Sequence, residues 1–128
     1  MTKPRILMIS VRADHGGGPR HLYQLIQNIH NDFEVYVACP FEEPYSSLFQ
    51  KIVGNQNMKA VPHRQFRFDK LKELTSFVRE KGIKLIHSHG KGAGLYGRLI
   101  GIRSGVSSIH TFHGVHVDNY GPLQKWMY

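Results

Sequence analysis

The chain has few of the residues that cross-link or anchor a protein. Cys39 is the only cysteine among 128 residues, so a disulfide within the chain is excluded, which fits a reducing compartment. Long apolar runs are also missing, and the short segment before Ile6 leads directly into an apolar stretch. The sequence therefore predicts neither a signal peptide nor a transmembrane helix. Cys39 lies in an apolar segment, and we expect it in the core rather than as a nucleophile.

Acidic residues are scarce as well. The chain has 9 Asp and Glu against 17 Lys and Arg, a net charge of +8. This balance favours anionic partners, which include nucleotides, phosphates, acidic lipid headgroups and nucleic acid. The usual nucleic-acid recognition signatures are absent, so nucleic acid is not an expected partner, although steeply salt-dependent binding would favour it. The length and an apolar fraction of 41% predict a single globular domain.

Apolar segments alternate with segments of helical periodicity along the whole chain. The expected strands are Ile6–Ser10, Phe33–Pro40, Lys59–Pro62, Ile83–Ser88 and Val106–Thr111. The expected helices are one carrying Leu22, Leu25, Ile26 and Ile29, then Pro44–Val53, Asp69–Lys81, Lys91–Arg103 and the start of another at Pro122–Tyr128. Asp69 is expected as an N-cap and Gly82 as a helix stop. The pattern predicts an α/β fold, a Rossmann-like open parallel sheet with helices on both faces and strand order 3-2-1-4-5.

A glycine loop, Gly16-Gly17-Gly18-Pro19, separates the first strand from the first helix. Glycines allow a tight turn and a close approach of ligand, and the N–H groups that open a helix suit a phosphate. Pro19 is expected at the first helical position. The alternative is a flexible turn without a ligand. The spacing departs from G-x-G-x-x-G, so no nicotinamide or flavin cofactor is expected.

Polar residues cluster where the expected strands end. They are Ser10–Arg12, His63, His87–Gly90 and His110–Gly114. In a parallel sheet these ends share one edge, so the glycine loop should face His89 and Gly90 across a crevice. His113 at that edge could donate to a sugar hydroxyl or phosphate, or move a proton, although it could also simply cap the strand.

Several histidines raise the question of a metal. His87 and His89 should point to the same face of a strand, and His110, His113 and His116 follow. No acidic or cysteine ligand shares their spacing, so a metal site is not expected.

Two further groups carry alternative interpretations. Gly97 and Gly101 are expected to allow close packing of a helix on the sheet, whereas Gly92 and Gly94 could serve packing or a ligand. A basic run with Phe66 and Phe68 interleaved is interpreted first as a solvated surface; it consists of His63, Arg64, Arg67, Lys70 and Lys72. A patch for an anionic membrane or a phosphorylated acceptor is the alternative.

Taken in order, these motifs resemble the N-terminal half of a GT-B glycosyltransferase of the family-4 type. The matching pieces are Arg5–Ser10, Gly16–Pro19 with His21-Leu22, Glu34–Val37, Leu85–Gly90, Ala93–Leu99 and Ile109–Gly114. The resemblance covers nearly the whole chain. It implies one half of a two-domain, retaining enzyme of hexosyltransferase type, which needs no metal or cofactor and transfers a sugar from a nucleotide-sugar donor.

The resemblance also implies roles for residues. The N-terminal domain would bind the acceptor, a sugar or glycolipid, and His113 would lie beside the transferred sugar as the catalytic candidate. Gly17 and Gly18 would reach the donor diphosphate or the acceptor. The remaining substrate-binding candidates are Arg12, His89, Gly90 and Gly114.

Many bacterial members of this family build lipopolysaccharide, capsule polysaccharide or glycolipid at the cytoplasmic membrane face. A cytoplasmic protein, in peripheral contact with the inner face of an anionic membrane, is therefore expected. Residues 1–128 would form one truncated domain without the C-terminal donor-binding domain, and this domain is expected to be inactive alone. The missing part would leave a sheet edge uncovered, which favours a homodimer. The alternative from a different class is a non-catalytic α/β module that binds a phosphorylated or anionic ligand.

Overall fold

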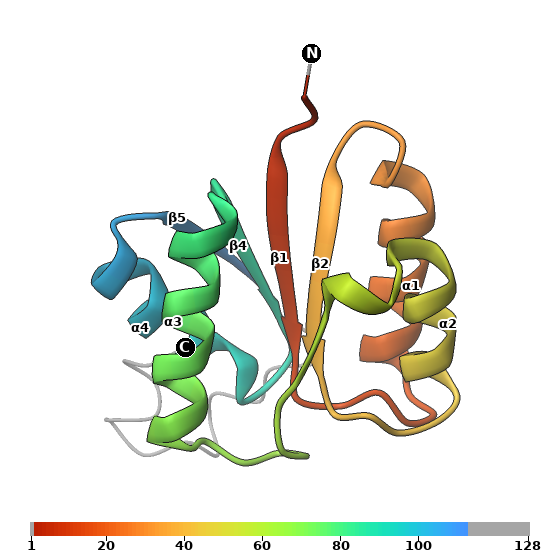
Figure 1. Ribbon diagram of the computed structural model, residues 1–128. Helices are drawn as coiled ribbons and strands as arrows, with labels where there is room; N and C mark the ends of the chain where they lie inside the picture. The colour runs from red at the N-terminus through yellow and green to blue at the C-terminus, as the bar shows by residue number, and fades with distance from the viewer. Residues whose placement is uncertain (1, 113–128) are drawn as a thin grey trace.

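The computed structural model describes residues 2–112, which form a five-stranded sheet and four α-helices (Figure 1). The elements are β1 (Arg5–Ser10), α1 (Gly17–Ile29), β2 (Glu34–Cys39), α2 (Tyr45–Val53), the 3-10 turn η1 (Asn55–Asn57), β3 (Met58–Ala60), α3 (Phe68–Lys81), β4 (Leu85–His89), α4 (Ala93–Ser104) and β5 (Ser107–Thr111). The strand order is β3-β2-β1-β4-β5, and every neighbouring pair is parallel. The expected α/β, Rossmann-like open sheet and its strand order are confirmed.

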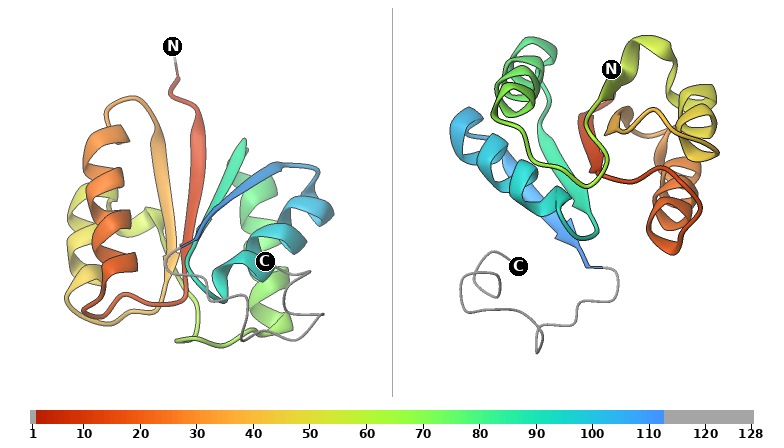
Figure 2. Two further views of the ribbon diagram at one scale, coloured as in Figure 1. Left: turned by 180° about the vertical axis from the view of Figure 1, so that it is seen from behind. Right: turned by 90° about the horizontal axis from the view of Figure 1, so that it is seen from below.

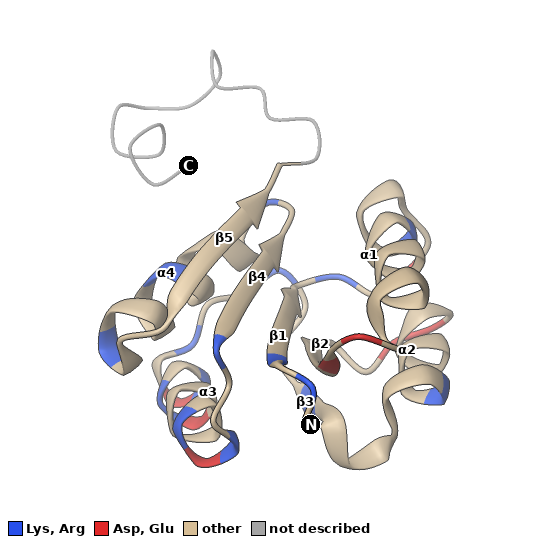
Figure 3. Ribbon diagram, turned by 90° about the horizontal axis from the view of Figure 1, so that it is seen from above, with Lys and Arg blue, Asp and Glu red and all other residues tan. Residues whose placement is uncertain are grey.

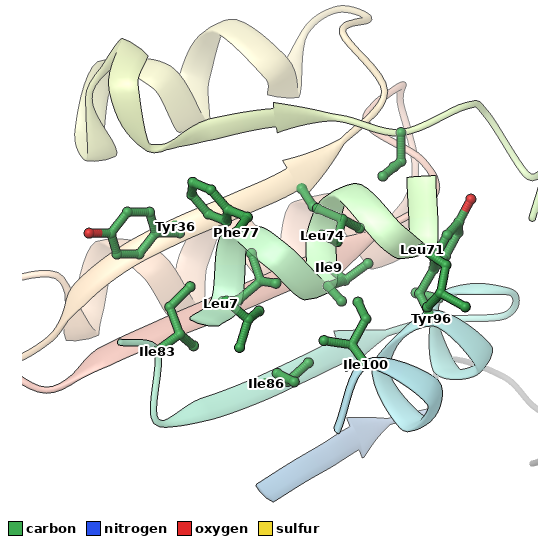
Figure 4. Packing of buried hydrophobic residues seen from close by; sticks show 14 of the residues in the cluster. Leu7, Ile9, Tyr36, Leu71, Leu74, Phe77, Ile83, Ile86, Tyr96 and Ile100 are labelled. Atoms are coloured by element: carbon green, nitrogen blue, oxygen red, sulfur yellow. The ribbon is translucent and has the colours of Figure 1, made fainter. Parts of the chain in front are cut away.

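Each face of the sheet carries a core of its own. On one face α1 and α2 pack over the first three strands, and Met8, Val37, Leu22 and Phe49 are fully buried between them. On the other face α3 and α4 cover Leu7, Ile9 and Ile86 (Figures 2 and 4). Cys39 is fully buried in the first core, which confirms its expected structural role. The central strand β1 is thus buried on both sides, as parallel sheets require.

Most element boundaries differ by one or two residues from those expected, and three of the differences have a clear local cause. Helix α1 begins at Gly17, so Pro19 is its third residue; its missing N–H still costs nothing there, because the first four N–H groups of a helix have no acceptor within it. Helix α3 begins at Phe68, and Asp69 lies in its first turn rather than at the N-cap. Strand β4 begins at Leu85 because the Ile83 N–H bonds the Val78 carbonyl, closing α3.

The glycines of α4 bring this helix onto the sheet. A Cβ on Gly97 would lie 3.0 Å from Ser88 Oγ, and one on Gly101 would lie 2.9 Å from the Val106 carbonyl oxygen. The distance at Gly101 is shorter than real Cβ contacts, and the one at Gly97 would require Ser88 to shift, which confirms close packing at both positions. Gly92, just before the helix, has φ +96 and its Cβ would meet Val11 at 3.1 Å, so conformation and packing both require glycine.

Candidate functional site

The loops that follow the strands gather at one edge of the sheet, as Figure 2 (right) shows from that side. The register places Ser10, His89 and Thr111 side by side at the ends of β1, β4 and β5. The Gly90 N–H donates to the Thr111 carbonyl at 3.0 Å, and Gly90 has φ +77, so the backbone turns there in a way that favours glycine. The predicted convergence of strand ends is therefore present in the described residues.

The loop before α1 is shaped by an internal ion pair. Arg12 Nε donates to Asp14 Oδ1 at 2.9 Å, and Arg12 NH2 donates to Asp14 Oδ2 and to the His15 carbonyl. This hydrogen bonding lowers the pKa of Asp14 and raises that of Arg12. The guanidinium would lie only 3.2 Å from a Cβ on Gly16. The Nε and NH2 groups of Arg12 thus hydrogen-bond within the loop and help to fix its shape.

Gly17 and Gly18 lie in the first turn of α1, at this edge of the sheet. A Cβ on Gly17 would meet nothing within 4 Å, so the space beside it is open. Backbone N–H groups in the first turn of a helix have no acceptor within that helix and carry partial positive charge. The Arg20 N–H bonds back to the Gly16 carbonyl at 3.2 Å, which starts the helical ladder.

His89 links the end of β4 to the start of α1. Its ring lies 3.9 Å, between centroids, from that of His87 and 6.3 Å from that of His21 on α1. His87 and His89 therefore share a face of the sheet, as predicted, and His87 Nε2 is hydrogen-bonded to Thr111 Oγ1 at 2.7 Å. His89 is only 2% exposed. It therefore presents little surface to a ligand.

His110 lies on the opposite face of the sheet from His87 and His89. Its Nδ1 is hydrogen-bonded to Ser88 Oγ at 2.7 Å, and its ring lies under Gly94, where a Cβ would come within 3.2 Å. The sheet thus separates the histidines that were weighed as a zinc set. His113, Gly114, His116 and the expected helix Pro122–Tyr128 lie outside the described residues.

Glu42 also lies at this edge of the sheet, although it was not among the predicted site residues. Its Oε1 accepts the Ala13 N–H at 2.8 Å and a hydrogen bond from His63 Nδ1 at 2.9 Å. The signal was available: Glu42 follows β2 just as His63 follows β3 and Arg12 follows β1.

Asp14, Glu42 and His63 bring ligand-type atoms within 4.8 Å of one another, a grouping that could hold a cation. Protein donors already occupy these atoms: Arg12 bonds both oxygens of Asp14, and Ala13 and His63 bond Glu42. Arg12 neutralises Asp14, and hydrogen bonds from Ala13 and His63 satisfy Glu42, so the three side chains form a complete hydrogen-bonded network.

The basic run after β3 is partly engaged within the protein. Arg67 pairs with Asp69 at 2.8 Å and Lys70 with Glu73 at 3.4 Å. Phe66 packs against the core beside Tyr96, whereas Phe68 is 72% exposed, as is Phe41, at 63%, after β2. Lys and Arg elsewhere are spread over several helices and loops (Figure 3). Within residues 2–112, no helix is long and apolar enough to span a bilayer.

An open parallel sheet with a glycine turn and polar side chains at the carboxyl ends of its strands is the arrangement in which α/β domains bind their ligands. The family model described as Glycosyltransferase Family 4 matches residues 15–128, most of the chain. The chain therefore belongs to this family and is a domain of the glycosyltransferase type. No curated protein matches it.

Proposed function

We propose that this chain is the acceptor-side, N-terminal half of a retaining GT-B glycosyltransferase of hexosyltransferase type. A donor domain following in the same reading frame would bind most of the nucleotide sugar, and residues 1–128 alone would be inactive. Membership of the family supports transferase activity. The observation that carries the proposal is the convergence of Gly17, His89 and Gly90 on one edge of the sheet.

Each candidate residue has a role in this proposal. The N–H groups of Gly17 and Gly18 would hold a phosphate or acceptor oxygen in the open space beside the first turn of α1. His113 would serve as the catalytic residue next to the transferred sugar, and Gly114 and Gly90 would allow close approach of substrate. Arg12 and His89 would shape the site from behind. No metal or cofactor is part of this scheme.

The decisive experiment extends the chain through the downstream reading frame and screens nucleotide sugars for hydrolysis and transfer. Transfer by the extended protein, and none by residues 1–128, is the expected result. His113→Ala should lower kcat strongly, with His30→Ala, at the far end of α1, as the matched control. Equal activity of the two variants would remove His113 from the catalytic role. Pyrophosphate binding without any transfer would support the non-catalytic module instead.

The second part of the proposal is a contact with the inner, anionic face of a bacterial membrane. Such a contact would fit a cytoplasmic enzyme of lipopolysaccharide, polysaccharide or glycolipid synthesis. The exposed Phe41 and Phe68, with the cations near Phe68, support it. Phe68→Ser should reduce co-sedimentation with vesicles containing phosphatidylglycerol, whereas Ile102→Ser, at an equally exposed position on α4, should not. Reduced co-sedimentation of both variants, or of neither, would contradict a specific contact of Phe68 with the membrane.

Two remaining expectations have direct tests. The edge strand β5 is paired with β4 alone among the described strands, and Ile109 on it is 50% exposed. A homodimer of the chain would therefore show as a doubled mass in sedimentation equilibrium, weakened by Ile109→Lys. We expect no nucleic acid partner; steeply salt-dependent binding to DNA or RNA would contradict that.

A further inference from the structure

Glu42 holds the segment that leads into the glycine turn. Its Oε1 accepts the Ala13 N–H at 2.8 Å, and the Ala13 carbonyl accepts the N–H of Tyr45, the first residue of α2, at 3.0 Å. Ala13 is fully buried. The loop between β2 and α2 therefore fixes both polar groups of one residue, three positions before Gly16.

The loop after β3 holds the same segment from another side. The Arg64 N–H donates to the Val11 carbonyl at 3.0 Å, and Arg64 adopts a left-handed φ of 52 that is uncommon outside glycine. His63, the preceding residue, bonds Glu42 itself through Nδ1. Glu42 is thus the one side chain that joins the loops after β1, β2 and β3 among the described residues.

We propose that Glu42 is a positioning residue that aims the Gly17 and Gly18 amides at an anionic ligand without touching that ligand. The inference rests on the proposed function, which makes these amides the phosphate-facing groups. Asp14 is hydrogen-bonded to Arg12, and Glu42 to His63. These contacts fix the path of the backbone between β1 and Gly16.

Positioning and simple electrostatics predict opposite effects of removing Glu42. A carboxylate near an anion repels it, so loss of the charge alone would tighten binding. Loss of the hydrogen bond to Ala13 would instead release the turn and weaken binding. The conservative change to glutamine separates the two, because its amide oxygen still accepts the Ala13 N–H while the charge is gone.

The test is a titration of residues 1–128 with inorganic pyrophosphate, followed through the backbone amide resonances of Gly17 and Gly18. Glu42→Ala should weaken binding about tenfold, the effect of losing one charge-assisted hydrogen bond. Glu42→Gln should bind at least as tightly as the unmodified chain. Glu43→Ala is the matched control: it removes the same charge from the next residue, whose carboxylate accepts a hydrogen bond from Ser47 on α2 at 2.5 Å.

Slow amide exchange at Leu7 and Ile86 in every variant verifies that the core stays folded. Equal or tighter binding by Glu42→Ala would overturn the positioning role, as would failure of Glu42→Gln to restore binding. Absence of any pyrophosphate shift in the unmodified chain would overturn it too. The proposed transferase activity is judged separately by the extended protein, so that assay can fail while the dependence of anion binding on Glu42 stands.

Discussion

At the scale of single residues, Tyr96 shows how one buried polar group organises a loop of the site. Its hydroxyl accepts the Arg67 N–H at 3.0 Å and donates to the Gln65 carbonyl at 2.9 Å, from a side chain that is fully buried. Tyr96→Phe should therefore destabilise the fold by about 1–3 kcal/mol, because two polar groups lose their partner. Urea denaturation would measure the change.

Tyr23→Phe provides the comparison for Tyr96. Tyr23 packs against Tyr45 and Phe49, and its hydroxyl makes none of the hydrogen bonds found among the described residues. Its loss should leave the urea midpoint nearly unchanged. Equal midpoints for the two variants would mean that the Tyr96 hydroxyl contributes nothing to holding Gln65 and Arg67.

The conformation or role of a residue could be predicted from the sequence when neighbouring residues in the chain determine it. Gly82 ends α3 with a left-handed φ of 64, and a glycine directly after a segment of helical periodicity predicts such an end. The position of Glu42 just after a strand placed it at this edge, but its hydrogen-bond partners could not be predicted, because Ala13 and His63 are 29 and 21 residues away. Arg12 was expected to face substrate, and only the structure shows its donors turned onto Asp14 and His15.

At the scale of elements, α4 tests whether glycine is required for packing. Gly101→Ala gains about 1 kcal/mol of helix propensity but forces a methyl group against the Val106 carbonyl, 2.9 Å away. Backbone cannot move aside as a side chain can, and overpacking costs about 1–3 kcal/mol. A net loss of stability in thermal unfolding is the expected result.

Gly17→Ala is the control for Gly101, because a Cβ there meets nothing within 4 Å. Its melting temperature should stay unchanged or rise slightly. A stabilised Gly101→Ala variant would show that the sheet and α4 adjust freely to the extra carbon.

Element order was predictable, whereas element ends were not. Hydrophobic periodicity and the positions of glycine and proline predicted the five strands and the four described helices in the right sequence, and the usual strand order of a doubly wound sheet matches the observed one. The ends depend on competition for hydrogen bonds: the Ile83 N–H closes α3 instead of joining the ladder, and Lys84 bonds Arg5 one step earlier than β4 begins. Such competition between neighbouring elements leaves no mark in local sequence.

At the scale of the whole molecule, ionisable side chains buried against both faces of the sheet should make the folded protein less stable at alkaline pH. Burial raises the pKa of the Cys39 thiol from 9.0 to about 12, and burial also raises the pKa values of Tyr36 and Tyr96. Each group binds its proton more tightly in the folded state. The resulting stability is complete below the unfolded pKa and is lost as pH rises toward the folded one.

The free energy of unfolding should therefore fall between about pH 9 and 12, with Cys39 contributing at most about 1.4 kcal/mol per pH unit. Urea denaturation at several pH values from about 8 to 10 reports mainly on the thiol, since the ordinary pKa of cysteine lies below the value of about 10 at which the contributions of Tyr36 and Tyr96 begin to be lost. Cys39→Ala should be less stable at neutral pH, because the sulfur leaves a cavity between β2 and its helices, yet show a flatter pH dependence. An unchanged slope in that variant would mean that Cys39 ionises in the folded protein as readily as in the unfolded chain, against its complete burial in the core.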